Sequence, residues 1–90
     1  MGKAHINIKI FGRVQGVFFR DSAGKKAEEL GIAGFARNEP DGSVYIEAEG
    51  GEKELQEFVE WCKAGPEFAK VEKAETSYGE VKGFKGFAAE

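Results

Sequence analysis

Cysteine and proline are scarce in this chain of 90 residues, which has one cysteine and two prolines. A single cysteine, Cys62, forms no internal disulfide, as is typical of proteins from a reducing compartment. The shortage of proline beside 13 glycines favours tight turns over a disordered linker. No apolar run reaches membrane-spanning length, and the first residues lead into a strand pattern rather than an apolar signal core. We therefore expect a cytoplasmic protein with no membrane partner.

Several kinds of catalytic centre have no counterpart in the sequence. No cluster of His, Cys and carboxylate residues has the spacing of metal ligands. A Cys-x5-Arg phosphatase loop is missing because position 68 is Phe, and no Asp-x-Asp supplies an aspartyl nucleophile. No glycine-rich stretch ends in the Gly-Lys-Ser/Thr of a P-loop. We expect neither a metal nor another cofactor.

Positive charge is short in the second half of the chain. Residues 1–40 carry seven Lys/Arg against four Asp/Glu, whereas residues 41–90 carry six against twelve. An acidic half does not suit a nucleic-acid backbone, although a small anion in a local positive pocket remains compatible with it. The length predicts a single domain, residues 1–90, and we expect a monomer.

Hydrophobic periodicity predicts an alternation of strands and helices. The predicted strands are 5–10, 32–37, 43–49 and 69–78, and a short final strand around Phe84 or Phe87 is possible. The predicted helices are 21–30, which ends at Gly31, and 52–64, which ends at Gly65. His5 is expected to be exposed on the polar side of the first strand, and Cys62 to be an inert, buried thiol.

The order β-α-β-β-α-β predicts an α+β fold. With right-handed crossovers and one hairpin, the favoured solution is the ferredoxin-like split β-α-β sandwich. We expect a four- to five-stranded antiparallel sheet that carries both helices on one face. In this topology strands 5–10 and 32–37 run parallel on either side of strand 43–49, so their carboxyl ends share one edge.

The three arginines all lie between positions 13 and 37, in two glycine-containing stretches, 12–20 and 34–42. Arginine grips phosphate or carboxylate through two hydrogen bonds, and stretch 12–20 leads into a helix N-terminus, which favours anions. Gly12 and Gly16 alone are explained by tight turns, and Arg20 alone by a surface salt bridge. Glycines and Arg20 together favour an oxyanion site.

Asn38 has two interpretations. Asn-Glu-Pro-Asp-Gly has the composition of a turn, so Asn38 by itself is a structural residue. The topology, however, places the end of strand 32–37 two strand spacings, about 10 Å, from the end of strand 5–10. Arg20 and Asn38 are then able to approach one small ligand from opposite sides, which favours a functional role.

These two stretches resemble the signatures of the acylphosphatase family. Gly12-x-Val-Gln-Gly-Val-x-Phe-Arg20 is similar to the first signature, and Gly34-Phe-Ala-Arg-Asn-x-x-x-Gly42-x-Val44 to the second. The resemblance runs from about Lys3 to Tyr78. It implies a ferredoxin-like fold and metal-free hydrolysis of acyl phosphates, with inorganic phosphate as product and inhibitor. It also implies that Asn38 positions the water, and that the phosphate is held by Arg20 and the loop amides of Gln15, Gly16, Val17, Phe18 and Phe19.

The motif also limits the chemistry that the site performs. It contains no general acid and no nucleophile, so the leaving group must depart without a proton. A carboxylate, whose conjugate acid has a pKa of about 4–5, meets this condition and an alkyl alcohol does not.

Two other classes of function remain: a non-catalytic anion-binding or regulatory module of the kind fused to hydrogenase-maturation proteins, and an RNA-binding module. Lys82–Phe87 only superficially resembles an RNA-binding motif, because Lys85 and Gly86 stand where small and aromatic residues are needed.

Overall fold

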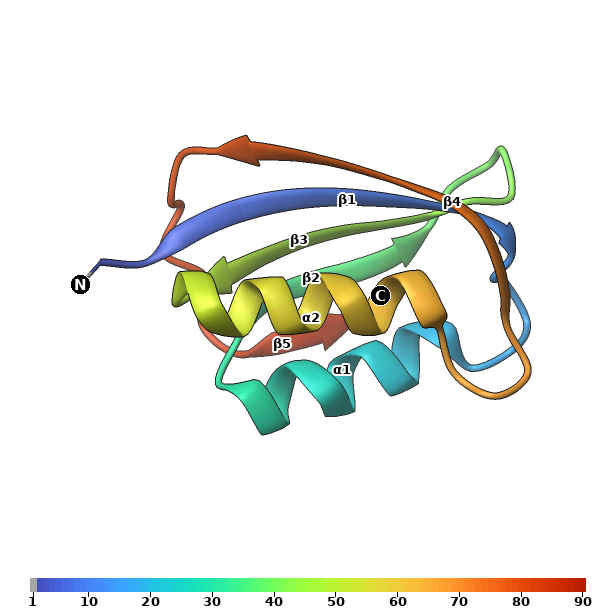
Figure 1. Cartoon of the computed structure of the whole chain (residues 1–90), viewed down its shortest axis with the longest axis horizontal. Helices are drawn as coiled ribbons and strands as arrows, with labels where there is room; N and C mark the ends of the chain where they lie inside the picture. The colour runs from blue at the N-terminus through green and yellow to red at the C-terminus, as the bar shows by residue number, and fades with distance from the viewer. Residues whose placement is uncertain (1) are drawn as a thin grey trace.

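The computed structural model describes residues 2–90 as two helices packed on one face of a five-stranded sheet (Figure 1). The sheet has the order β4-β1-β3-β2-β5. The elements are β1 (Ala4–Arg13), α1 (Phe19–Leu30), β2 (Ala33–Asn38), β3 (Val44–Gly50), α2 (Glu52–Ala64), β4 (Lys70–Gly79) and β5 (Phe87–Ala89). The predicted ferredoxin-like arrangement is confirmed. Within the described residues, neither helix is long and apolar enough to cross a membrane.

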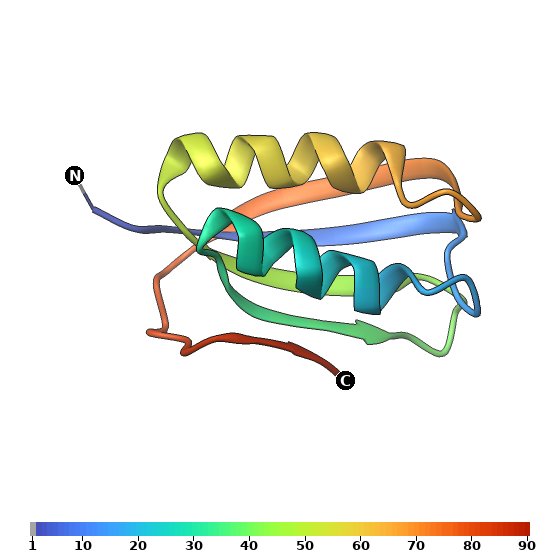
Figure 2. The ribbon, with the colours of Figure 1, turned by 90° about the horizontal axis from the view of Figure 1, so that it is seen from below.

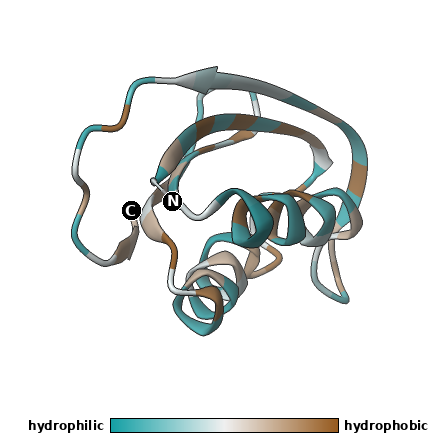
Figure 3. Ribbon diagram, turned by 60° about the vertical axis from the view of Figure 1, so that its left-hand side comes forward, coloured by the Kyte–Doolittle hydropathy of each residue, from teal (hydrophilic) through white to brown (hydrophobic). Residues whose placement is uncertain are grey.

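The core lies between the sheet and the helices, which form two layers (Figure 2). Ile6, Ile8 and Ile10 are at most 3% exposed, because every second residue of β1 faces the helices. The alternation of apolar and polar residues along the strands is visible in Figure 3. Strand β1 pairs antiparallel with β3 and β4, so it is an interior strand of the sheet.

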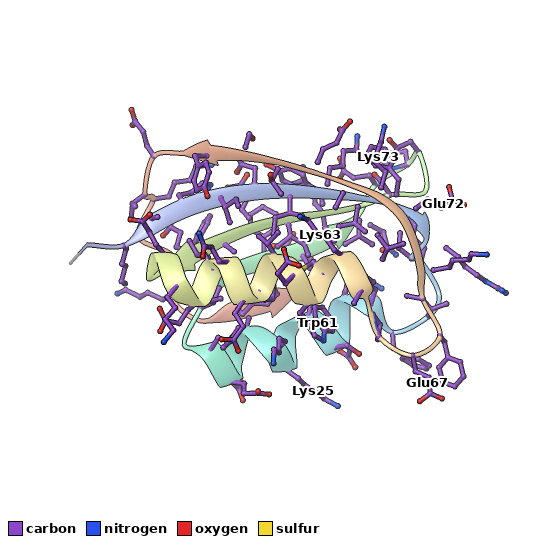
Figure 4. All side chains as sticks on the ribbon, in the orientation of Figure 1. Lys25, Trp61, Lys63, Glu67, Glu72 and Lys73 are labelled. Carbon is purple, nitrogen blue, oxygen red and sulfur yellow. The ribbon has the colours of Figure 1, made fainter. Side chains whose placement is uncertain are left out.

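Both helices use apolar stripes that the sequence predicts. Helix α2 has the predicted bounds and buries Leu55, Phe58 and Cys62. Burial raises the pKa of the Cys62 thiol well above its usual range, as expected for an inert thiol. Trp61 lies between the two helices, with its ring centroid 5.5 Å from that of Phe19 (Figure 4). Helix α1 starts two residues earlier than predicted, at Phe19.

The fifth strand departs from the expected antiparallel sheet, because β5 pairs parallel with β2. Segment 80–86 leaves β4 at one edge of the sheet and crosses to the other edge, so β5 enters beside the start of β2 (Figure 2). The Phe87 ring then packs on Phe58. Gly24 of α1 also faces Phe87, and a Cβ at this position would lie 3.7 Å from the Phe87 ring. Since 3.7 Å is an ordinary van der Waals contact, this packing does not require a glycine at position 24.

The prediction that His5 is exposed is wrong. His5 lies on the sheet face away from the helices, as its place in the alternation implies, but it is only 2% exposed. Segment 80–86 covers this end of that face, and the Phe84 ring centroid lies 5.9 Å from that of His5. The same cover buries Glu47 and Glu49.

Candidate functional site

Residues 14–18 form a loop between β1 and α1 that is anchored at both ends. Val14 and Phe19 are each 1% exposed and belong to the core. Between them, Gly16 and Phe18 have left-handed backbones, with φ of 73° and 63°. Such a conformation costs a non-glycine residue about 1–2 kcal/mol. Phe18 is also 73% exposed, so the loop carries an exposed aromatic ring beside backbone strain of the kind that clusters at active sites and ligand clamps.

The N-terminus of α1 presents backbone donors at the end of this loop. The first helical hydrogen bond runs from Ser22 N to Phe18 O, so the amides of Phe19, Arg20 and Asp21 precede the bonded part of the helix. Phe18, the N-cap residue, supplies no side-chain cap. Together with the helix dipole, these amides favour an anion at this point.

Arg20 lines a pocket of about 340 Å³ beside the loop. Gly16, Phe18 and Phe19 line the same pocket, so four of the predicted site residues meet there. Arg20 Nη1 donates a hydrogen bond to the backbone oxygen of Glu90. The guanidinium group is therefore held beside the end of β5 rather than by an acidic side chain.

The Gln15 side chain has a tethering role. Its Nε2 donates to two backbone oxygens, those of Glu39 and Ser43, both at 2.9 Å. These residues belong to the turn between β2 and β3, next to Asn38. Gln15 therefore holds the loop against the turn, which leaves its backbone amide as the group available to a ligand.

Asn38 ends β2 on the side of the sheet that carries the helices. It pairs with the buried residue Val44, whose other neighbour is Ile10. Directly paired residues point to the same face, so Asn38 faces the side on which α1 and Arg20 lie. Asn38 is exposed and lies outside the lining of the pocket. Arg37, one residue earlier, points to the opposite face, where its Nε donates to Glu39 at 2.8 Å.

The turn after Asn38 is ordered by Asp41. The Asp41 carboxylate accepts hydrogen bonds from the side chain and the backbone N–H of Ser43. These bonds, with a contribution from Lys9 at 3.1 Å, lower the pKa of Asp41 to about 2. The turn thus keeps its geometry at neutral pH, which holds the end of β2 in place.

Three pocket-lining residues, Val14, Asp21 and Ala89, were missed by the sequence analysis. Val14 lies within the first motif and Asp21 directly follows it, so their closeness in sequence to Arg20 is the signal that could have identified them. Ala89 reaches the pocket only because β5 pairs with β2, and no local pattern indicates that pairing.

The donor set of the pocket consists of backbone amides and one guanidinium group. Among residues 2–90, no group of three or more His, Cys, Asp or Glu side chains is arranged to hold a metal ion. This arrangement is able to bind a small oxyanion, because the guanidinium group supplies a positive charge and the amides supply hydrogen-bond donors.

Comparison with known proteins points to one family. The sequence model of the acylphosphatase family matches residues 6–89. The acylphosphatase of Thermus thermophilus is 51% identical over 76 residues, which cover 84% of this chain and 86% of that protein. The acylphosphatase structure from Coxiella burnetii has a TM-score of 0.94 at 34% identity, covering 98% and 93% of the two chains.

The module also occurs within a larger protein. A full-length HypF structure has a TM-score of 0.87 at 30% identity, and the match covers 98% of this chain but 12% of HypF. The acylphosphatases, in contrast, match along most of their own length. With the family signatures, the fold and the loop in agreement, this chain belongs to the acylphosphatase family, the enzymes that hydrolyse the bond between a carboxyl group and a phosphate.

Proposed function

We propose that Arg20 and the amides of Gln15, Gly16, Val17, Phe18 and Phe19 bind the phosphoryl group of an acyl phosphate. The observation that carries this assignment is the pocket beside Arg20, where the left-handed loop meets the uncapped start of α1. Transfer of a phosphoryl group passes through a loose, metaphosphate-like transition state. Fixed amides and a guanidinium group that neutralise its equatorial oxygens supply most of the catalysis.

Asn38 is proposed to position the attacking water. Its side chain lies on the helix-bearing side of the sheet, next to the turn that Gln15 ties to the loop. An amide oxygen that accepts a hydrogen bond from water orients it for attack opposite the leaving group. The water proton passes to a phosphoryl oxygen of the substrate, since the proposed site contains no general base.

The leaving group departs as a carboxylate, with no proton supplied. This requirement restricts the substrates to acyl phosphates and makes alkyl phosphate esters poor substrates. Inorganic phosphate, the product, occupies the same donors. We also propose that the chain acts as a single-domain monomer in the cytoplasm, without a nucleic-acid or membrane partner, on the basis of its composition and charge.

Hydrolysis of benzoyl phosphate by wild type and Arg20→Ala tests the assignment. Loss of an oxyanion donor costs about 10²–10³-fold in rate, and loss of the charge adds to this, so kcat/KM should fall at least this far. Arg37→Ala is the matched control, because Arg37 lies on the opposite face and pairs with Glu39. Retention of more than a tenth of wild-type kcat/KM by Arg20→Ala would show that Arg20 does not bind the phosphoryl group.

A non-catalytic, anion-binding module is the second candidate, favoured by the match to part of HypF. It predicts phosphate binding without turnover. The same preparation distinguishes the two, because calorimetry measures the Kd for phosphate and the benzoyl phosphate assay measures hydrolysis.

A further inference from the structure

The Glu49 carboxylate holds a turn that lies at the opposite end of the sheet from the pocket. Its Oε1 accepts hydrogen bonds from the backbone N–H groups of Gly83 and Phe84, both at 3.0 Å. Its Oε2 accepts from the backbone N–H of Lys82 and from His5 Nδ1, the latter at 2.7 Å. Four donors on one carboxylate leave little capacity unused.

The Glu49 carboxylate is buried, so its hydrogen bonds decide whether it is ionised. Glu49 is 2% exposed, and burial by itself favours the neutral form. The hydrogen bonds from Lys82, His5, Phe84 and Gly83 outweigh burial and lower the Glu49 pKa to about 2. The turn is therefore bound to a carboxylate that is ionised at neutral pH. Charge-assisted hydrogen bonds of this kind are stronger than neutral ones.

The turn at 82–84 lies directly before β5 and so determines where this strand begins. Only two residues separate Phe84 from Phe87, the first residue of β5. Gly34 N donates to Gly86 O at 2.9 Å, and β5 then runs along β2 until Glu90 N donates to Ala36 O at 2.8 Å. At this end Ala89 lines the pocket and the Glu90 backbone oxygen accepts from Arg20.

We propose that Glu49 is a positioning residue for the phosphate site, acting through the 82–84 turn and β5 on Arg20. The carboxylate fixes where β5 begins, and β5 fixes the strand end that orients the guanidinium group. A three-residue strand at the sheet edge has few bonds of its own, so its placement depends on this anchor. The inference rests on the proposed role of Arg20.

Glu49→Gln, with Glu47→Gln as the matched control, tests this role. Gln has the shape of Glu but lacks the charge, and its NH₂ group would face backbone donors. Glu47 is a neighbouring buried carboxylate of β3 that contacts Lys82 Nζ, Tyr45 and His5 only through side chains. The readouts are the Kd for inorganic phosphate, hydrogen exchange of the Glu90 and Gly34 amides, and KM and kcat for benzoyl phosphate.

In Glu49→Gln, exchange at the Glu90 and Gly34 amides should accelerate at least tenfold, while the β1 amides of Ile8 and Ile10 keep their protection. The Kd for phosphate should rise at least threefold and kcat/KM should fall at least as far, because Arg20 binds both the phosphate and the transition state. Glu47→Gln should leave the Kd for phosphate unchanged. If Glu49→Gln does not fold, Glu49→Asp, which keeps the charge with a shorter reach, takes its place in the same measurements.

An unchanged Kd for phosphate in Glu49→Gln overturns the proposal, whether or not β5 exchanges faster. An equal rise in Glu47→Gln also overturns it, because the effect would then follow from lost charge alone. The Kd and the exchange data do not require turnover. Failure of wild type to hydrolyse benzoyl phosphate would therefore contradict the catalytic function and leave the test of Glu49 intact.

Discussion

At the scale of single residues, Asn38 offers the sharpest distinction between a structural and a catalytic role. If Asn38 holds the nucleophilic water, its contact matters mainly in the transition state. Asn38→Ala should then lower kcat about 10²-fold or more and leave the Kd for phosphate within about twofold. Its Tm should stay close to that of wild type, because Asn38 is exposed. A variant with a lowered Tm and full specific activity would mark Asn38 as a turn residue only.

The donor set of the site also predicts the response to chelators. Amides and a guanidinium group bind phosphate without a divalent ion, so activity should survive excess EDTA. Inorganic phosphate should inhibit competitively, since it occupies the donors that bind the phosphoryl group. Initial rates over a grid of substrate and phosphate concentrations, with and without EDTA, provide the measurement. Loss of activity in EDTA that a divalent ion restores would reveal a metal site.

At the scale of elements, two glycines around the loop serve different purposes. Gly12 lies at a β-bulge between β1 and β4 with φ of 126°, and a Cβ there would lie 2.2 Å from Lys70 O. Gly16 has φ of 73° and no atom within 4 Å of an added Cβ. Gly12→Ala should therefore destabilise the fold by about 2–4 kcal/mol, because the clash is with backbone. Gly16→Ala should cost only the left-handed strain of about 1–2 kcal/mol.

Urea unfolding of Gly12→Ala and Gly16→Ala measures this difference in the free energy of unfolding. Gly12 lies in β1 just before the loop and Gly16 lies within the loop, so each variant serves as the control of the other. Equal free energies of unfolding would contradict the close approach of β1 and β4 at the bulge. The close approach of β1 and β4 lets β1 extend to Arg13. The loop that leads to α1 begins directly after this residue.

At the scale of the whole molecule, Glu49 links the acid stability of the protein to its fold. The Glu49 pKa of about 2 in the folded state lies below its ordinary value of 4.5. A lowered pKa contributes stability that is present above pH 4.5 and is lost as the pH falls toward 2. The free energy of unfolding should thus decline across this window. The difference between wild type and Glu49→Gln should shrink with it, as urea titrations at pH 7, 4.5 and 3 would measure. A difference that stays constant with pH would contradict this account.

Much of the fold and of the candidate site follows from short-range patterns. Helix α2 has the bounds that its apolar spacing and Gly65 predict. Arg20 and the loop lie within nine consecutive residues, so local chain geometry alone brings them together. The predicted order of elements was also sufficient to place β3 between β1 and β2.

The tertiary structure decided the features that depend on contacts between distant parts of the chain. Glu49 meets the 82–84 turn across sequence separations of 33 to 35 residues, and this contact buries His5 on a face that local alternation marks as polar. The sequence allowed a short strand at Phe87 but did not predict its partner, and the parallel pairing of β5 with β2 is what brings Ala89 to the pocket. Alternation along a strand reveals which face a side chain occupies. Whether that face is covered depends on where the rest of the chain runs, and here a buried carboxylate directs that path.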